Sequence, residues 1–191
     1  NHERSNTLSF LPGSMIAVYT AIIGGYDEVK PLQHRCAGVD YFLITDRQVE
    51  TNWTSRETVL LENSPVLTAR YYKMNPHLVL PDYDITVWVD GSFHVTGNMI
   101  ELIETFMGLE DMMVVRHRGR DCIYEEAEAC IAIGKGDQLD LKTQIVNYRE
   151  RGYPKNNGLI ESGTIIRRNN TRVNELNNLW WQEILNHSYR D

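Results

Sequence analysis

Three stretches of the chain are apolar at most consecutive positions rather than at every second one. They are Met15–Ile23, Asp40–Thr45 and Asp84–Val89, and they are rich in β-branched and aromatic residues. A strand that packs on both faces has this pattern, because neither face meets water. We therefore predict three buried strands. Two shorter apolar stretches, Met112–Val115 and Gly163–Ile166, predict two more.

The segments between these strands carry helical spacing and helix-ending residues. Ser64 before Pro65 is typical of a helix start, and this helix is expected to end at Asn75-Pro76. Further helices are predicted over 98–109, 122–133 (capped by Asp121), 138–151 (capped by Asp137 and closed by Gly152), and from Thr171 onward. The positions expected to face the core in the first and last of these helices are Ile100, Ile103, Phe106 and Met107, and Val173, Leu176, Trp180 and Ile184.

Strands and helices alternate along the chain, which predicts an α/β fold with a largely parallel sheet flanked by helices. Ligands of such sheets bind beyond the carboxyl ends of the strands. The polar groups that follow the predicted strands should therefore line one edge. They are Tyr26-Asp27, Asp46, Asp90-Gly91-Ser92 and the basic segment Arg116–Arg120.

Length and composition fit one soluble globular domain, with 191 residues, 42% of them hydrophobic and 24% charged. We expect this domain over residues 15–191, continuing beyond 191 in a longer polypeptide, with residues 1–14 as a disordered lead-in or linker. No apolar run is long enough to span a membrane. The net charge of -7 argues against a nucleic-acid partner. Proteins that bind nucleic acids usually carry the opposite charge, because their basic side chains neutralise phosphates.

The three cysteines, Cys36, Cys122 and Cys130, are odd in number and widely spaced, which does not suggest a disulfide framework. A reducing compartment follows as the expectation. We accordingly expect a cytoplasmic protein, or one in the host cytoplasm if the source is viral, in preference to the Golgi lumen.

Asp90-Gly91-Ser92 is the candidate metal motif. A carboxylate directly after a buried strand can hold Mn²⁺ or Mg²⁺ that also binds phosphate oxygens, and Gly91 lets the backbone approach a ligand. Ser92 adds an oxygen but no charge. The alternative is a simple strand-to-loop turn, where Asp-Gly is common.

Two sets of basic residues are candidates for phosphate contacts. Arg70 and Lys73 stand three apart on one predicted helix, so both can face the same direction. His117 and Arg120 belong to the basic segment after the fourth predicted strand. In each case the alternative is a solvated surface, which charge clusters usually form.

Glu161 lies in a polar, glycine-rich approach to the last predicted strand, 156–163. It could orient an acceptor hydroxyl or take its proton as a general base, and it could equally cap a turn. Trp180-Trp181 has the spacing of core residues, although one ring could face a carbohydrate. The motifs typical of serine hydrolases, P-loop NTPases, dinucleotide-dependent dehydrogenases and zinc proteases are absent from the sequence.

Several segments together resemble one family, in that family's order and over about residues 15–191. They are VYTAIIGGYD, VDYFLITD, ARYYKMNPH, YDITVWVDGSF, RDCIYEEAEAC, GYPKNNGLIESGTIIRRN and NLWWQEI. The family is the glycosyltransferase-like family long catalogued as a domain of unknown function. It occurs in bacteria, large algal viruses and plants, and its plant members include enzymes implicated in pectin and mucilage polysaccharides.

The resemblance implies a GT-A fold, a Rossmann-like α/β nucleotide-binding half with an acceptor half behind it. By position it implies that Thr20, Tyr26 and Asp46 lie near the base and ribose, and that Arg70 and Lys73 face the diphosphate. Asp90 would be the first acid of a D-x-D-type motif, in which Ser92 replaces the second. Glu161 would lie beside the reacting sugar. Asp191, the last residue of the sequence, falls in a motif that continues Arg-Asp-Gln in the family, and could bind acceptor or metal.

The sequence therefore predicts a metal-dependent glycosyltransferase, a hexosyl- or deoxyhexosyltransferase of polysaccharide biosynthesis. Its donor would be a nucleotide sugar, UDP-type favoured, its acceptor a glycan, and its cofactor Mn²⁺ or Mg²⁺. The predicted catalytic residues are Glu161 and Asp191. The predicted donor-binding residues are Thr20, Tyr26, Asp46, Arg70, Lys73 and Gly91, with His117 and Arg120 for acceptor or phosphate and Asp90 and Ser92 for metal. Two alternatives stay open: a metal-dependent hydrolase and a non-catalytic sugar-binding module.

Overall fold

The computed structural model describes residues 13–190, and these residues form an α/β fold around one six-stranded sheet. The strand order is β3-β2-β1-β4-β6-β5. The strands are β1 (Ile16–Ile22), β2 (Val39–Thr45), β3 (Thr54–Glu57), β4 (Ile85–Val89), β5 (Met112–Arg116) and β6 (Ile160–Arg168). The pairs β1–β2, β1–β4 and β2–β3 are parallel, whereas β6 is antiparallel to both of its neighbours. Among the described strands, β6 alone is therefore reversed, and the mostly parallel sheet is confirmed.

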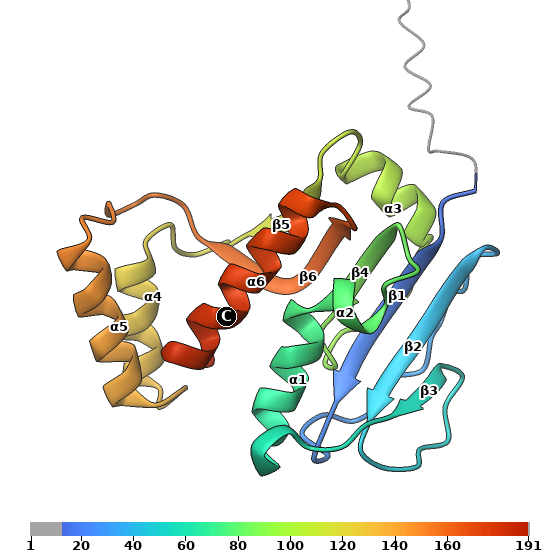
Figure 1. The fold of residues 1–191 in the computed structure, drawn as a ribbon, viewed down its shortest axis with the longest axis horizontal. Coiled ribbons are helices and arrows are strands. Elements are labelled where there is room, and N and C mark those ends of the chain that lie inside the picture. The colour runs from blue at the N-terminus through green and yellow to red at the C-terminus, as the bar shows by residue number, and fades with distance from the viewer. Residues whose placement is uncertain (1–12, 191) are drawn as a thin grey trace, which may run out of the picture.

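Helices cover both faces of this sheet (Figure 1). The helical elements are η1 (Leu61–Asn63), α1 (Pro65–Met74), α2 (Pro76–Val79), α3 (Met99–Phe106), α4 (Ile123–Ala132), α5 (Gln138–Glu150) and α6 (Thr171–Asn186). One core cluster packs Ile103 of α3 and Met107, the C-cap of that helix, against β1 residues such as Val18. The opposite cluster places Ala69 of α1 and Trp180 of α6 against Tyr19 and Trp88.

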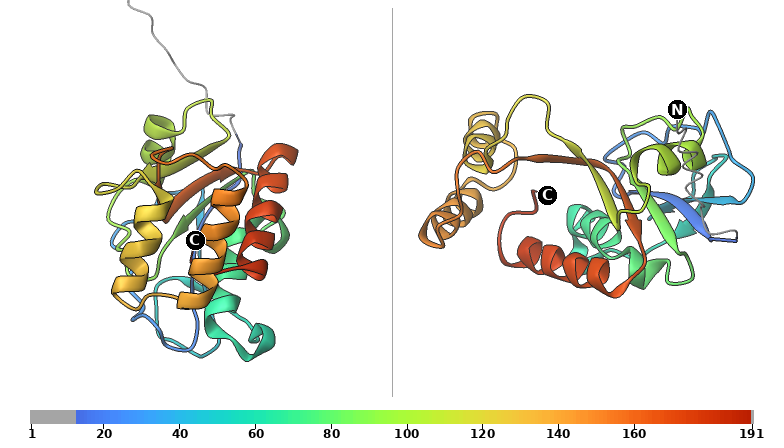
Figure 2. Two further views of the ribbon diagram at one scale, coloured as in Figure 1. Left: turned by 90° about the vertical axis from the view of Figure 1, so that its left-hand side faces the viewer. Right: turned by 90° about the horizontal axis from the view of Figure 1, so that it is seen from above.

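The helices α4 and α5 pack on each other and stand away from the main body of the sheet (Figure 2). In the view from above, β6 runs from their side of the molecule into the sheet, and the C-terminal end of the chain lies between them and the rest.

Most of the predicted elements are confirmed, with bounds that differ by one or two residues. Ser64 caps α1 by accepting a hydrogen bond from the Leu67 amide, and Asp137 caps α5 by accepting from Leu139 and Asp140. The prediction that Asp121 caps the next helix was wrong, because the N-cap of α4 is Cys122.

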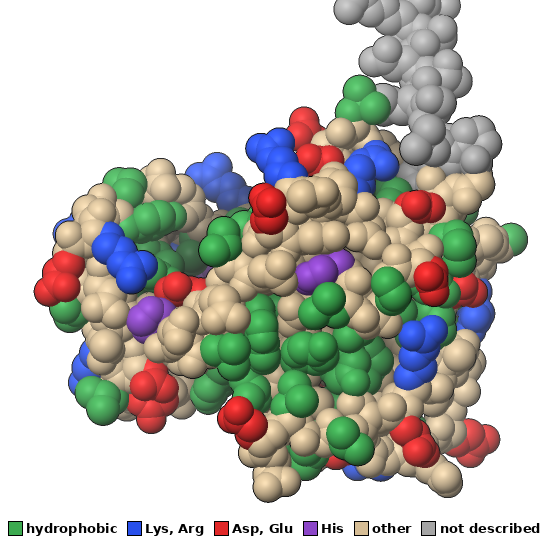
Figure 3. Space-filling view, viewed as in Figure 1, with side chains coloured by type: hydrophobic (Ala, Val, Ile, Leu, Met, Phe, Trp, Pro, Cys, Tyr) green, Lys and Arg blue, Asp and Glu red, His purple; other side chains and the backbone are tan. Residues whose placement is uncertain are grey.

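Two predicted core positions were also wrong. Phe106 is 64% exposed and Leu176 is 45% exposed. The buried side of α6 instead includes Asn177, at 1%. On the face shown in Figure 3, apolar side chains gather over α1, α2 and α6, where Leu78, Leu176 and Leu179 are exposed.

Strand β3 was not predicted, because its four residues are all exposed and carry no alternation of apolar and polar side chains. Strand β6 is longer than predicted, because it also includes polar residues on both sides of the apolar stretch, Glu161 and Ser162 before it and Arg167 and Arg168 after it. The predicted lead-in falls largely on residues 1–12, and Asp191 follows the last described residue; both lie outside the described residues. Within residues 13–190, no helix has the length and apolar character needed to cross a membrane.

Candidate functional site

A small cavity of about 140 Å³ lies at the carboxyl edge of β1 and β4. Its polar lining comes from Tyr26 and Asp27 after β1, Arg70 on α1, and Asp90 and Ser92 after β4. Tyr26 is 84% exposed, so its ring stands at the rim. The expected convergence of polar groups after neighbouring strands is therefore found for β1 and β4.

Gly91 fits this cavity because it has no side chain. A Cβ at this position would lie 2.8 Å from Ile22 Cγ1 and 2.9 Å from Asp27 Oδ2. Either contact would force its neighbour to move, so glycine lets the backbone after β4 lie against the end of β1. Asp27 thus lies beside the Asp90-Gly91-Ser92 motif. The sequence signal for it was its place in the polar turn, Gly24-Gly25-Tyr26-Asp27, that follows a buried strand.

Asp90 is held by two donors on the same carboxylate oxygen. Trp88 Nε1 donates to Asp90 Oδ1 at 2.7 Å, and Lys73 Nζ donates to the same atom at 3.2 Å. The Lys73 side chain is 1% exposed, whereas the Asp90 side chain is 36% exposed. Lys73 also donates to Ser162 Oγ at 3.0 Å. The two basic residues of α1 therefore differ: Arg70 lines the cavity, while Lys73 is buried against Asp90.

Two buried side chains fix the end of α1 that carries Lys73. The Tyr19 hydroxyl donates to the carbonyls of Tyr72 and Lys73 at 3.2 and 3.3 Å. Arg167, which is 1% exposed, donates through Nη1 to the Lys73 carbonyl at 2.7 Å. Burial raises the pKa of Tyr19, so this hydroxyl keeps its proton and remains a donor. These contacts satisfy carbonyls that a helix end would otherwise leave unpaired.

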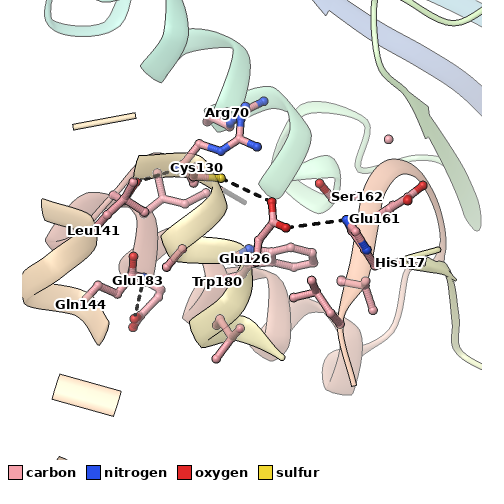
Figure 4. Close-up of a pocket in the computed structure, with 18 of the residues that line it drawn as sticks. Arg70, His117, Glu126, Cys130, Leu141, Gln144, Glu161, Ser162, Trp180 and Glu183 are labelled. Carbon is pink, nitrogen blue, oxygen red and sulfur yellow. Dashed lines mark hydrogen bonds and ion pairs between the residues drawn. The ribbon is translucent and has the colours of Figure 1, made fainter. Parts of the chain in front are cut away.

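A second cavity of about 500 Å³ lies between α4, α5, α6 and the start of β6 (Figure 4). Its volume is within the usual range of small-molecule sites. Of the described residues, Arg70 and Asp90 line both this larger cavity and the smaller one, and no other residue does so. Arg70 Nε also donates to the Tyr189 carbonyl at 3.1 Å, which holds the C-terminal segment beside the site.

Glu161 and Ser162 enter the larger cavity from an irregular part of β6. The pairing of β6 with β5 jumps from Ile165 to Glu161 between Val114 and Val115, which is a bulge. Bulges change the direction in which side chains point and are frequent beside active sites. Glu161 Oε1 accepts a hydrogen bond from the Arg118 amide at 3.3 Å. Ser162 was not predicted as a site residue, and its contact with Lys73 could not be read from spacing.

His117 and Arg120 are placed differently from each other. His117 lines the larger cavity, and its Nδ1 accepts from the amides of Gly119 and Arg120 at 3.1 and 2.9 Å. Arg120 pairs with Glu126 of α4 and lines a separate open depression formed by the basic segment. The structure therefore brings His117 to the cavity with Glu161, but not Arg120.

Thr20 and Asp46 lie near the carboxyl edge without facing either main cavity. Thr20 is 3% exposed, and no described residue offers its Oγ1 a hydrogen-bond partner. It lines a void of about 10 Å³ together with Trp53 and Asp90. Both Asp46 carboxylate oxygens accept from the Gly24 amide, at 3.1 and 3.0 Å, which ties the end of β2 to the turn after β1.

The hard oxygen atoms that could hold a divalent cation are those of Asp90, Asp27 and Ser92, which line one cavity. Within residues 13–190 there is no group of three or more His, Cys, Asp or Glu side chains arranged as a metal site. Mg²⁺ is commonly bound through one or two carboxylates together with substrate phosphates. This donor set fits such a cation when a phosphate completes it.

Comparison with known proteins agrees with this arrangement. The model of the TOD1/MUCI70 glycosyltransferase-like domain matches residues 5–191. The chain is also 22% identical over 206 residues to a protein of Arabidopsis thaliana named probable hexosyltransferase MUCI70. That match covers 92% of the chain and 36% of the relative, so the chain spans about a third of the relative's length. Because the family model covers nearly the whole sequence, the chain belongs to the TOD1/MUCI70 family of glycosyltransferase-like domains.

Proposed function

We propose that the domain transfers a hexosyl group from a nucleotide sugar, with a UDP-type donor favoured, to a hydroxyl of a glycan acceptor. One observation carries the proposal: two cavities meet at Arg70 and Asp90. A transferase must hold two substrates with their reacting atoms at one point. The smaller cavity, at the strand ends, suits the diphosphate end of the donor, and the larger one suits the acceptor. Family membership and the name of the plant relative support the same reaction class.

In the donor cavity, Arg70 is the residue for the diphosphate. A guanidinium presents paired donors to phosphate oxygens and keeps its charge at any physiological pH. The exposed Tyr26 ring at the rim suits the base or ribose of the nucleotide. Lys73 was predicted to contact the diphosphate directly. We propose instead that it holds Asp90 through the hydrogen bond to Oδ1 and places its positive charge near the diphosphate.

The metal part of the proposal places Mn²⁺ or Mg²⁺ at Asp90, with Ser92 and Asp27 as further oxygen donors. Lys73 and Trp88 both contact Asp90 Oδ1, and no described residue donates a hydrogen bond to Oδ2. When bound, such a cation neutralises negative charge that develops on a departing diphosphate. The hydrogen bonds on Oδ1 orient the carboxylate for this purpose.

Transfer breaks the bond between the anomeric carbon and the diphosphate oxygen and forms a bond from that carbon to the acceptor oxygen. The acceptor hydroxyl loses its proton in the process. Glu161 is the residue we propose to receive it, because its carboxylate lies in the acceptor cavity. The hydrogen bond from the Arg118 amide to Oε1 fixes this side chain. The electron pair of the broken bond leaves with the nucleotide, where Arg70 binds the added charge.

The test is a panel of nucleotide sugars incubated with manganese and scored for nucleotide release, with and without glycan acceptors. A transferase consumes its donor much faster with an acceptor than without one. Equal rates would indicate a metal-dependent hydrolase. A sugar-binding module would release no nucleotide, and UDP with Mn²⁺ would not raise its melting temperature, because only a ligand that binds the folded state does so.

We also propose that the domain works in the cytoplasm, as part of a longer polypeptide. The three cysteines are free, and two of them, Cys122 and Cys130, are buried thiols. Free thiols agree with a reducing compartment. Labelling of these thiols in freshly lysed cells of the source would test the location.

A further inference from the structure

The larger cavity has an inner end that the proposed transfer chemistry does not use. In Figure 4, Gln144 and Glu183 lie on one side of the pocket, and His117 and Glu161 lie on the other. Gln144 and Tyr148 come from α5, and Glu183 comes from α6. Residues of α4, α5 and α6 thus line the cavity opposite His117 and Glu161.

The three polar side chains at this end are fixed by one another. The Tyr148 hydroxyl donates a hydrogen bond to Glu183 Oε1. Gln144 Nε2 donates to the Tyr148 oxygen at 3.0 Å and to Glu183 Oε1 at 3.2 Å. The reverse amide orientation would place the Gln144 carbonyl against the Glu183 carboxylate, so this orientation follows from the charges. Burial, together with Glu183, raises the pKa of Tyr148, which keeps the phenol protonated.

Tyr148 and Gln144 both donate to Glu183 Oε1. The polar atoms of these three side chains that remain without a hydrogen bond from a described residue are therefore acceptors. No described residue donates to Glu183 Oε2 or to Gln144 Oε1. Neither atom is sealed in the protein interior, since neither is among the buried atoms that lack a partner. This side of the cavity therefore presents two acceptors that no described residue satisfies, and a ligand bound there can supply hydroxyl or amino protons to them. Arg190 lines the same cavity and adds a donor to it.

Apolar side chains line the cavity together with these acceptors. Ile145 of α5 and Ile184 and Trp180 of α6 line the same cavity. A hydroxylated ring suits both features, because its hydroxyls meet the acceptors while its C–H faces meet the aliphatic and aromatic side chains. We propose that Glu183, Gln144 and Trp180 form a binding subsite for an uncharged sugar residue of the glycan acceptor. This inference depends on the proposed function, since it assigns the acceptor side of the same site.

Glu183 favours a neutral sugar over an acidic one, because an acidic sugar beside its carboxylate would place two negative charges side by side. Arg190 also lines the cavity and supplies a positive charge to it. His187 Nε2 lies 3.6 Å from Glu183 Oε1.

The experiment compares sugar binding and nucleotide binding in three proteins: the wild type, Glu183→Gln and Glu175→Gln. The Glu183→Gln change keeps the shape of the side chain and an oxygen for Tyr148, but it removes the charge. Glu175 is exposed on the same helix and serves as the matched control. Methyl glycosides of glucose, galactose, mannose, xylose and rhamnose are the probes, with binding followed by ligand-observed NMR. UDP with Mn²⁺ is titrated separately by calorimetry.

We expect the wild type and Glu175→Gln to bind at least one glycoside equally, and Glu183→Gln to bind it about tenfold more weakly. UDP affinity should be the same in all three, which also shows that the variant is folded. The inference is overturned if no glycoside binds the wild type, or if Glu183→Gln binds as well as the wild type does. If the wild type binds glycosides but not UDP with metal, the proposed function fails while the sugar subsite stands.

Discussion

Replacing Asp90 by asparagine separates the proposed chemical role of this residue from its structural one. The substitution keeps the size of the side chain and one oxygen, and it removes the negative charge. The chemical role needs that charge to hold a cation against a diphosphate. The structural role needs an acceptor for Trp88 Nε1 and for the buried ammonium of Lys73.

The structural cost follows from these two contacts. A hydrogen bond to a charged partner contributes about 1.5–3 kcal/mol, against about 1 kcal/mol for a neutral pair. Both contacts survive in the variant with a neutral acceptor, and the Asp90 side chain is 36% exposed, so water offsets part of the loss. We expect the free energy of unfolding to fall by about 1–2 kcal/mol. For a domain of this size, this lowers the melting temperature by roughly 3–6 °C.

The functional cost should be far larger, because an electrostatic group at a reacting centre commonly contributes a hundredfold or more to the rate. Urea denaturation measures the free energy of unfolding, and nucleotide release with donor, manganese and acceptor measures the rate of transfer. Asp82→Asn is the control, since Asp82 is exposed and bonds to no described residue. Turnover of the Asp90 variant within about threefold of wild type would refute the chemical role. A fall of more than about 4 kcal/mol in the free energy of unfolding would refute the energetic reasoning and make Asp90 a structural residue.

Three further predictions address other parts of the site. Arg70→Ala should weaken UDP binding about tenfold by calorimetry, through loss of a charged phosphate contact; an unchanged affinity would remove Arg70 from the donor site. Glu161→Gln should lower acceptor-dependent transfer at least a hundredfold while leaving UDP affinity intact, and a rate close to wild type would exclude it as the base. Burial and Glu183 raise the pKa of Tyr148 in the folded state, so the unfolded chain loses this proton first as pH rises. The linked stability is present in full below pH about 10 and is lost above it. Tyr148→Phe should therefore flatten the fall in unfolding free energy between about pH 10 and 12 in urea titrations, and equal slopes would contradict this reading.

The sequence predicted the sheet and the position of the site because both depend on local patterns. Uniform apolar runs marked β1, β2 and β4, and the polar residues after them marked the edge where the cavities lie. Caps such as Ser64 and Asp137 could be read because each acts on amides within three residues along the chain.

Features that depend on distant contacts could not be predicted. Nothing in the order of residues shows that Lys73 turns inward to Asp90 and Ser162, since this depends on how α1 lies across the sheet. The exposed strand β3 lacks an apolar face, so it had no pattern to detect. The pairing of Arg120 with Glu126 agrees with the alternative of a solvated surface, where opposite charges often neutralise one another.

Because β6 runs antiparallel to its neighbours, a change in its register would affect the candidate site and the core together. The first part of this strand carries Glu161 and Ser162 of the candidate site. Its last part lies in the core, where Arg167 donates a hydrogen bond to the Lys73 carbonyl at the end of α1. Because neighbouring side chains of a strand face opposite ways, sliding β6 by one position against β4 would exchange inward and outward groups at both ends together. Mutations that loosen the alignment of this strand should therefore abolish the proposed transfer activity while the far-UV circular dichroism of the domain stays close to that of the wild type.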